Sequence, residues 1–297
     1  MWRWTKKANP PRSDEMMQLG NILVGTLVIL IVTALAAFSQ GGPAKMGRIG
    51  CPQCVNDGSP ISLSLQKADE LYASFKTKEA RSELLRVLAW DPQNAEALSK
   101  MARVYIEFAD LIPESSPDWQ AKRMVEYRTA EDYARKSVKA DPNSTWGHFY
   151  VAASLGNVAA LSPVAKQIDL AGEIREAIEK AIALDPQNGF AYHVYGIWHR
   201  KMAEIGKTKR LFAAVLYGRS VPKGSLDQSI DYLRKAVALD PTVIASRLEL
   251  AKSYVAVENW TLARKFLVSV RGLPIQFSDD AKHKQKAEQL LEEIKER

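Results

Sequence analysis

The only two cysteines among the 297 residues, Cys51 and Cys54, stand in the motif Cys-Pro-Gln-Cys. Redox-active pairs with this spacing begin a helix that follows a strand, and no such context surrounds these two. Haem attachment would need a histidine next, and residue 55 is valine. A zinc site needs four ligands, so two chains would have to share it. We expect a local disulfide, with an intermolecular disulfide, a shared metal or free thiols as alternatives.

No other residue pattern predicts catalysis. The four histidines, His148, His193, His199 and His283, lack metal-ligand spacing. The stretch GRSVPKGS at 218–225 lacks the Gly-Lys-Ser/Thr ending of a phosphate-binding loop. We therefore predict no enzyme activity, no catalytic residue, no metal and no cofactor.

The positive charge is modest, with a formal net charge of +7, and it is spread along the chain. No nucleic-acid-binding signature accompanies it, so we expect no nucleic-acid partner. One local concentration lies in the insertion at 206–225. Its cations could bind phosphate or lipid headgroups, or they could form a solvated surface. They are Lys207, Lys209, Arg210, Arg219 and Lys223.

Residues 19–38 run for 20 positions without a charge, which is the length of a membrane-spanning helix. A cleaved signal peptide is the alternative, but the apolar run is long for one. Four cations precede this segment and two follow it closely, which predicts a cytoplasmic segment at 1–18 and an exported domain. Residues 39–62 read as a linker. We expect a single-pass protein with its domain in the bacterial periplasm, or else on the mitochondrial outer membrane facing the cytosol.

The remaining chain shows an internal repeat. Asp-Pro follows an amphipathic segment four times, with the prolines at Pro92, Pro142, Pro186 and Pro241. Small residues recur at fixed distances from each proline, as paired helices require. The sequence therefore predicts an all-α tetratricopeptide-repeat superhelix of antiparallel helix pairs over 63–278. Residues 279–297 predict a C-terminal capping helix, with one apolar face.

The prolines lie 50, 44 and 55 residues apart, whereas a regular array would repeat every ~34 residues. We expect the extra residues in lengthened turns near 109–121, 157–169 and 204–224. Within the third, 211–217 reads as a short helix that packs its apolar side onto the array.

The third insertion carries a resemblance to a family. The segment 179–205, followed by 209–241, resembles the regulator of microtubule dynamics family. The shared features are Gly196 and Trp198, Arg210, Leu216 with Tyr217, and a turn with Pro222 and Ser225. The resemblance covers about 95–295 and implies a non-enzymatic, membrane-tethered helical adaptor. Relatives are associated with microtubules and organelle contacts, where lipid binding has been proposed.

In such a superhelix the first helix of each pair lines a concave groove. Counting forward from each proline predicts a groove that mixes aromatic and basic side chains. Phe149, Phe190 and His193 could instead pack in the core, and Arg200 and Lys201 could be solvated. The groove candidates are Arg103, Trp146, Phe149, Asn157, Phe190, His193, Ile197, Arg200, Lys201 and Lys252.

These observations predict a membrane-anchored adaptor that binds a protein partner through its groove. An apolar floor with a cationic rim would also suit an anionic phospholipid, so lipid binding or transfer is the alternative. A thiol redox or metal site at the Cys-Pro-Gln-Cys linker is a second alternative.

Overall fold

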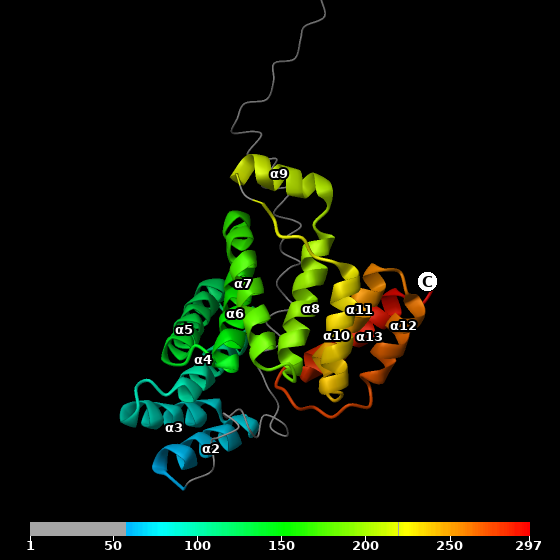
Figure 1. Cartoon of the computed structure of the whole chain (residues 1–297). Helices are drawn as coiled ribbons and strands as arrows, with labels where there is room; N and C mark the ends of the chain where they lie inside the picture. Colours follow the sequence, from blue (N-terminus) through cyan, green and yellow to red (C-terminus); the bar gives the residue numbers. More distant parts are fainter. Residues whose placement is uncertain (1–57, 219) are drawn as a thin grey trace, which may run out of the picture.

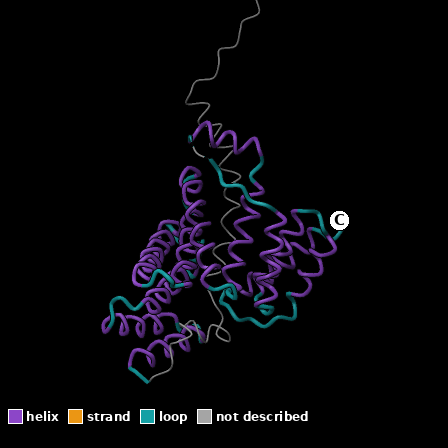
Figure 2. The backbone as a smooth tube through the Cα atoms, in the orientation of Figure 1, coloured by secondary structure: helices purple, strands orange, loops and turns teal. Residues whose placement is uncertain are grey.

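The structure is a computed structural model that describes residues 58–218 and 220–297. Every regular element in those ranges is an α-helix (Figure 1, Figure 2). None of the helices found there is both long enough and apolar enough to cross a bilayer. The predicted membrane segment at 19–38, most of the linker and the pair Cys51 and Cys54 lie outside the described residues.

The helices follow one another in pairs, each with a first and a second helix joined by a turn. The first helices are α2 (Pro60–Ala73), α4 (Ala95–Asp110), α6 (Thr145–Ala160), α8 (Gly189–Glu204) and α11 (Ile244–Ala256). Their second helices are α3 (Thr77–Trp90), α5 (Trp119–Ala140), α7 (Val164–Leu184), α10 (Leu226–Leu239) and α12 (Trp260–Ser269). Two helices lie outside the pairs: α9 (Lys207–Tyr217), inserted between α8 and α10, and α13 (Asp280–Glu293).

The Asp-Pro motifs end helices as predicted. Helix α3 stops at Trp90, and the side chain of the next residue, Asp91, accepts a hydrogen bond from the main-chain N–H of Gln93 at 3.1 Å. Asn94 then caps α4 by accepting from the N–H of Ala97 at 2.9 Å. The proline prevents the helix from continuing, and the aspartate before it stabilises the turn that follows. The polar residue two positions after the proline then caps the next helix. The same pattern repeats before α6 and α8.

Small residues lie where paired helices touch, which was also predicted. Ala80, Ala130, Ala102 and Ala152 are all fully buried. Gly196 of α8 shows the closest approach, since a Cβ atom placed there would lie 2.5 Å from Cγ of Leu233 on α10. Only glycine allows α8 and α10 to pack at this distance.

The extra residues between prolines are not all in turns, contrary to our expectation. Residues 111–118 do form a long turn between α4 and α5, but the turn between α6 and α7 is only 161–163. The predicted loop at 157–169 is instead mostly helix, because Pro163 precedes α7 and nothing after it breaks the helix. Much of the extra length between the prolines lies in helices α5 and α7, which have 22 and 21 residues, whereas α3 has 14.

Two main apolar clusters join the pairs. One spans α4 to α8 and includes Ile106, Leu155 and Trp198. The other joins α10 to α13, where Ala287 and Ile294 at the C-terminal end pack against α11 and α12. A smaller cluster holds α2 and α3 onto α4. Helix α13 thereby covers the end of the last pair, as a capping helix should.

Helix α9 differs from expectation in its orientation. Its large apolar side chains Leu211, Phe212 and Val215 are exposed, and the small Ala213 is the residue buried against the array. The prediction that this helix packs its apolar side inward is therefore wrong. Figure 1 shows α9 at one end of the molecule, beyond the ends of α7 and α8.

Candidate partner-binding face

The first helices carry many buried polar side chains on one side. Arg103 and Lys252 directly follow Ala102 and Ala251, the small residues that pack within their own pairs. Because successive residues are about 100° apart on a helix, these side chains point away from the second helices. We call the side chains on this side of α2, α4, α6, α8 and α11 the inner face.

At the α2–α4 end of the inner face, one carboxylate holds two cations. Lys100 Nζ lies 2.5 Å from Oδ2 of Asp69, and Arg103 Nη2 lies 3.0 Å from Oδ1 of the same residue. The guanidinium of Arg103 also lies 3.8 Å from the ring centre of Tyr72. Both cations are only 1% exposed, so these contacts fix the positions of their charges.

Aromatic rings meet where α6 approaches α8. The ring centre of Trp146 lies 5.4 Å from that of Phe149 and 6.1 Å from that of Phe190, in edge-to-face or tilted orientations. Phe277, from the loop between α12 and α13, closes the group at 6.4 Å from Phe190. Phe149 is fully buried within the main apolar cluster, whereas Trp146 and Phe190 are half-buried. This aromatic cluster joins the two halves of the array.

Between α8 and α11 the inner face carries a charge network. Arg200 pairs with Glu249 through Nη2 and with Glu204 through Nη1, the latter at 3.3 Å. Lys252 Nζ lies 2.6 Å from the other carboxylate oxygen of Glu249. Two turns before Arg200, Nδ1 of His193 lies 3.1 Å from the hydroxyl of Ser246.

The network determines which groups are ionised. Burial alone would raise the pKa of Glu249, but Lys252 and Arg200 hold that pKa far below its usual range. Burial lowers the pKa of Lys201, and the neighbouring Arg200 lowers it further. Burial also lowers the pKa of His193 well below its usual value. At neutral pH the inner face therefore has an ionised Glu249 and a neutral His193.

Asn157, near the end of α6, is 1% exposed, and neither its Nδ2 nor its Oδ1 has a hydrogen-bond partner among the described residues. The hydroxyl of Tyr150 on the same helix is also buried without a partner there. Such groups are destabilising unless something binds them. Unsatisfied atoms of this kind cannot be recognised from sequence spacing.

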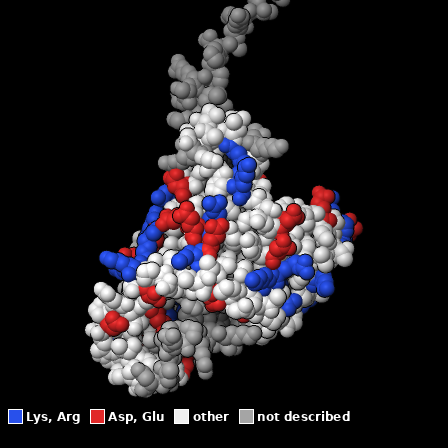
Figure 3. Space-filling view, viewed as in Figure 1, with Lys and Arg blue, Asp and Glu red and all other residues white. Residues whose placement is uncertain are grey.

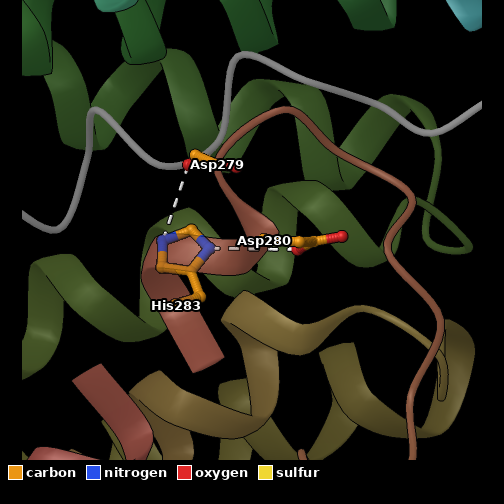
Figure 4. Close-up of side chains that lie close together, drawn as sticks. All are labelled: Asp279, Asp280 and His283. Carbon is orange, nitrogen blue, oxygen red and sulfur yellow. Dashed lines mark ion pairs between the residues drawn. The ribbon is translucent and has the colours of Figure 1, made fainter. Parts of the chain in front are cut away.

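The start of α13 brings two aspartates and a histidine together, as Figure 4 shows. Nε2 of His283 lies 3.5 Å from Oδ2 of Asp279, and Nδ1 lies 3.9 Å from Oδ1 of Asp280. The imidazole thus lies between two carboxylates, each facing a different nitrogen. A single metal ion could bind only one of these nitrogens, so the two carboxylates do not converge on one metal position.

The predicted groove candidates all belong to first helices of the pairs, namely α4, α6, α8 and α11. Trp146, Phe190 and Lys252 are half-buried. The others are at least nine-tenths buried: Arg103, Phe149, Asn157, His193, Ile197, Arg200 and Lys201. Their part in binding a partner stays a prediction. The sequence reasoning missed Lys100 and Glu249, which the spacing to Arg103 and Lys252 (three residues) could have indicated.

The described members of the predicted basic cluster, Arg210 and Lys223, have different surroundings. The Arg210 guanidinium donates to the main-chain carbonyls of Met202, Ile205, Val221 and Pro222. Its donors are therefore used within the protein. Lys223 is exposed. The side chains of Lys207, Lys209 and Arg219 lie outside the described part.

Paired helices, small residues at their contacts and a polar inner face define a tetratricopeptide-type helical repeat protein. A solved structure supports this fold: a thermophilic tetratricopeptide-repeat protein of Thermus thermophilus superposes with a TM-score of 0.55 at 16% identity. That match covers 78% of this chain and 98% of the other.

The family model of regulator of microtubule dynamics protein 1-3 matches residues 64–295, and the chain belongs to this family. The mouse regulator of microtubule dynamics protein 1 is 29% identical over 238 residues, covering 80% of this chain and 76% of the relative. Its Caenorhabditis elegans counterpart is 24% identical over 229 residues, covering 77% of this chain and 98% of the relative. The resemblance noted in the insertion is thus confirmed, and it extends over the first pair as well.

Proposed function

We propose that the protein is a membrane-anchored adaptor that holds an acidic segment of a protein partner against its inner face. The observation that carries the proposal is the excess of fixed cations between α8 and α11. There Arg200 and Lys252 pair with the buried carboxylate of Glu249, and Lys201 lies 3.8 Å from Glu204, so three cations face two carboxylates. A carboxylate of a partner would gain from a positive site that is already oriented and partly desolvated.

The edge of this site is accessible. The Lys252 side chain is 29% exposed. Lys286, on α13, is exposed as a residue, but partial desolvation of its ammonium group, together with nearby Lys252, lowers its pKa. An incoming anion would relieve the repulsion between these two lysines. The half-buried rings of Trp146 and Phe190 lie further along the same face and could hold an apolar side chain of the partner.

The membrane anchor in this proposal rests on the uncharged run at 19–38 and the cations before it. With that orientation the repeat domain faces away from the cytoplasm in a bacterial inner membrane. The alternative, a domain that faces the cytosol on a mitochondrial outer membrane, requires the opposite orientation of the span. The names of the relatives describe regulators of microtubule dynamics. The residues of the inner face do not distinguish a microtubule from another acidic partner, so the proposal defines the partner by its chemistry.

Photo-crosslinking of the full chain in its native membrane would test the proposal. A photoreactive amino acid at position 252 should capture a protein that the same group at position 139 does not. Lys139 is a matched control, since it is a lysine on the second helix α5, away from the inner face. With the captured partner purified, Lys252→Glu should weaken binding about tenfold, equivalent to about 1.4 kcal/mol. Equal capture from both positions, or unchanged affinity, would contradict the proposal.

The same apolar and cationic groups favour a second candidate, an anionic phospholipid bound on the inner face. The rings of Trp146 and Phe190 could hold acyl chains, and Arg200 and Lys252, further along, could hold a phosphate. Native mass spectrometry of the full chain, followed by lipid extraction, separates the candidates. A phospholipid retained by the native chain and lost in Lys252→Glu would favour lipid binding over the adaptor role.

A further inference from the structure

Helix α9 presents an apolar strip to the outside of the molecule. Leu211, Phe212 and Val215 are 65%, 45% and 73% exposed. With about 100° between successive residues, these three positions lie on one side of the helix. Among the exposed large apolar residues of the described chain, no other helix carries three within five positions.

Arg210 holds this strip outward. Its guanidinium donates to Met202 and Ile205 at the end of α8 and to Val221 and Pro222 in the linker before α10. Ala213, one turn further on, is 2% exposed on the same side. Because Arg210 and Ala213 bind the helix to the array, the opposite side of α9 must face solvent. The way in which the insertion is attached to the array therefore keeps the apolar strip exposed.

The charge within the insertion has one sign, although the exposed Glu204 ends the preceding helix α8. Residues 206–225 contain five lysines or arginines and no aspartate or glutamate. Two of them, Lys207 and Lys209, belong to the first turn of the same helix. In the space-filling view of Figure 3 the visible surface over α9 is white, and both blue and red surface lies below it.

An exposed apolar strip in a segment that has cations and no anions of its own matches the chemistry of an anionic membrane surface. An acidic protein surface would also attract the cations, but it would leave three large apolar side chains against polar groups. We propose that α9 lies in the interface of an anionic membrane, with Leu211, Phe212 and Val215 inserted among the lipid headgroups and acyl chains. This contact is separate from the inner face and does not depend on a partner being bound there.

An environment-sensitive fluorophore on residue 215 tests this in the full chain. The label is attached to Val215→Cys in a chain that also carries Cys51→Ser and Cys54→Ser. Val125→Cys is the matched control, since Val125 is a valine on helix α5 with 63% exposure. Each labelled chain is reconstituted into vesicles of phosphatidylcholine, with or without a minority of phosphatidylserine.

We expect the emission of the label at 215 to shift to shorter wavelength in the vesicles with phosphatidylserine. Doxyl-labelled lipids should quench it there, and high salt should reduce both effects. The label at 125 should show neither effect. Adding Phe212→Asp, at an exposed position where a polar residue is compatible with folding, should abolish the shift at 215.

Three results would overturn the proposal. The label at 215 could stay in water with anionic vesicles. Both labels could shift together, which would show non-specific adsorption. The label at 215 could shift without vesicles as the protein concentration rises, which would assign the strip to a second copy of the chain.

Discussion

Arg200 of α8 and Glu249 of α11 form an ion pair in which the side chains are only 5% and 4% exposed. The pair links the fourth and fifth helix pairs at the inner face, and Lys252 shares the carboxylate. Removing one partner of a buried ion pair leaves the other charge desolvated without compensation.

Replacing Glu249 by alanine should therefore lower the free energy of unfolding by about 3–5 kcal/mol. Urea unfolding followed by circular dichroism measures this. The control is the double variant Arg200→Met, Glu249→Leu, which removes both charges of the pair. It should recover part of the loss, because Lys252 and Glu204, which lose their partners, are more exposed to water. If Glu249→Ala unfolds at the same urea concentration as the native chain, the pair does not contribute as its burial implies.

The buried imidazole of His199 should make the free energy of unfolding depend on pH. The imidazole is 5% exposed among the rings of Tyr195, Trp198 and Tyr232, and burial lowers its pKa from 6.5 to about 4. The unfolded chain binds the proton more readily than the folded chain. The free energy of unfolding should therefore be greatest above pH 6.5 and fall between pH 6.5 and 4, with each unit of pKa shift worth about 1.4 kcal/mol.

Comparing variants isolates this effect. His199→Phe keeps a ring in the aromatic group but cannot be protonated, so its stability should fall less steeply than that of the native chain in this pH window. His148→Gln, which removes a half-buried histidine outside the aromatic group, serves as the control for the loss of an imidazole. Parallel curves for His199→Phe and the native chain would mean that His199 is not the group that titrates.

Replacement by alanine should have opposite effects on stability at two helix glycines, Gly196 in the α8–α10 contact and Gly172 in α7. In Gly196→Ala the new Cβ would lie 2.5 Å from Cγ of Leu233 and 3.1 Å from the carbonyl oxygen of Ser229, so we expect a loss of about 1–3 kcal/mol. Gly172, inside α7, has open space where a methyl group would be added, and Gly172→Ala should gain about 0.5–1 kcal/mol. Thermal unfolding of both variants checks the prediction, and a stabilising Gly196→Ala would refute the close packing.

Asn157 gives a test for an unsatisfied buried group. Because neither amide atom has a partner among the described residues, Asn157→Leu should raise the free energy of unfolding by about 1–3 kcal/mol in the purified protein. The conservative Asn157→Gln keeps the polar group and should give no gain. A destabilised leucine variant would show that the amide is satisfied by a bound molecule or ordered water.

The helix ends and the small contact residues could be predicted from the sequence because their causes are local. Proline cannot continue a helix beyond its first turn, and Asp91 and Asn94 act on main-chain groups within three residues of themselves. The period of these signals was enough to predict a tetratricopeptide array and to place the groove candidates on the first helices. The location of the extra residues was only partly predictable, since a helix such as α7 can lengthen without any new signal.

What only the tertiary structure decided depends on residues far apart in the chain. The pairing of Arg200 with Glu249 spans 49 residues, and that of Arg103 with Asp69 spans 34. The outward direction of the α9 strip is likewise set by carbonyls at both ends of the insertion, which Arg210 brings together. Local sequence determines which residues form helices, whereas the burial and charge of each side chain depend on which helix packs against it.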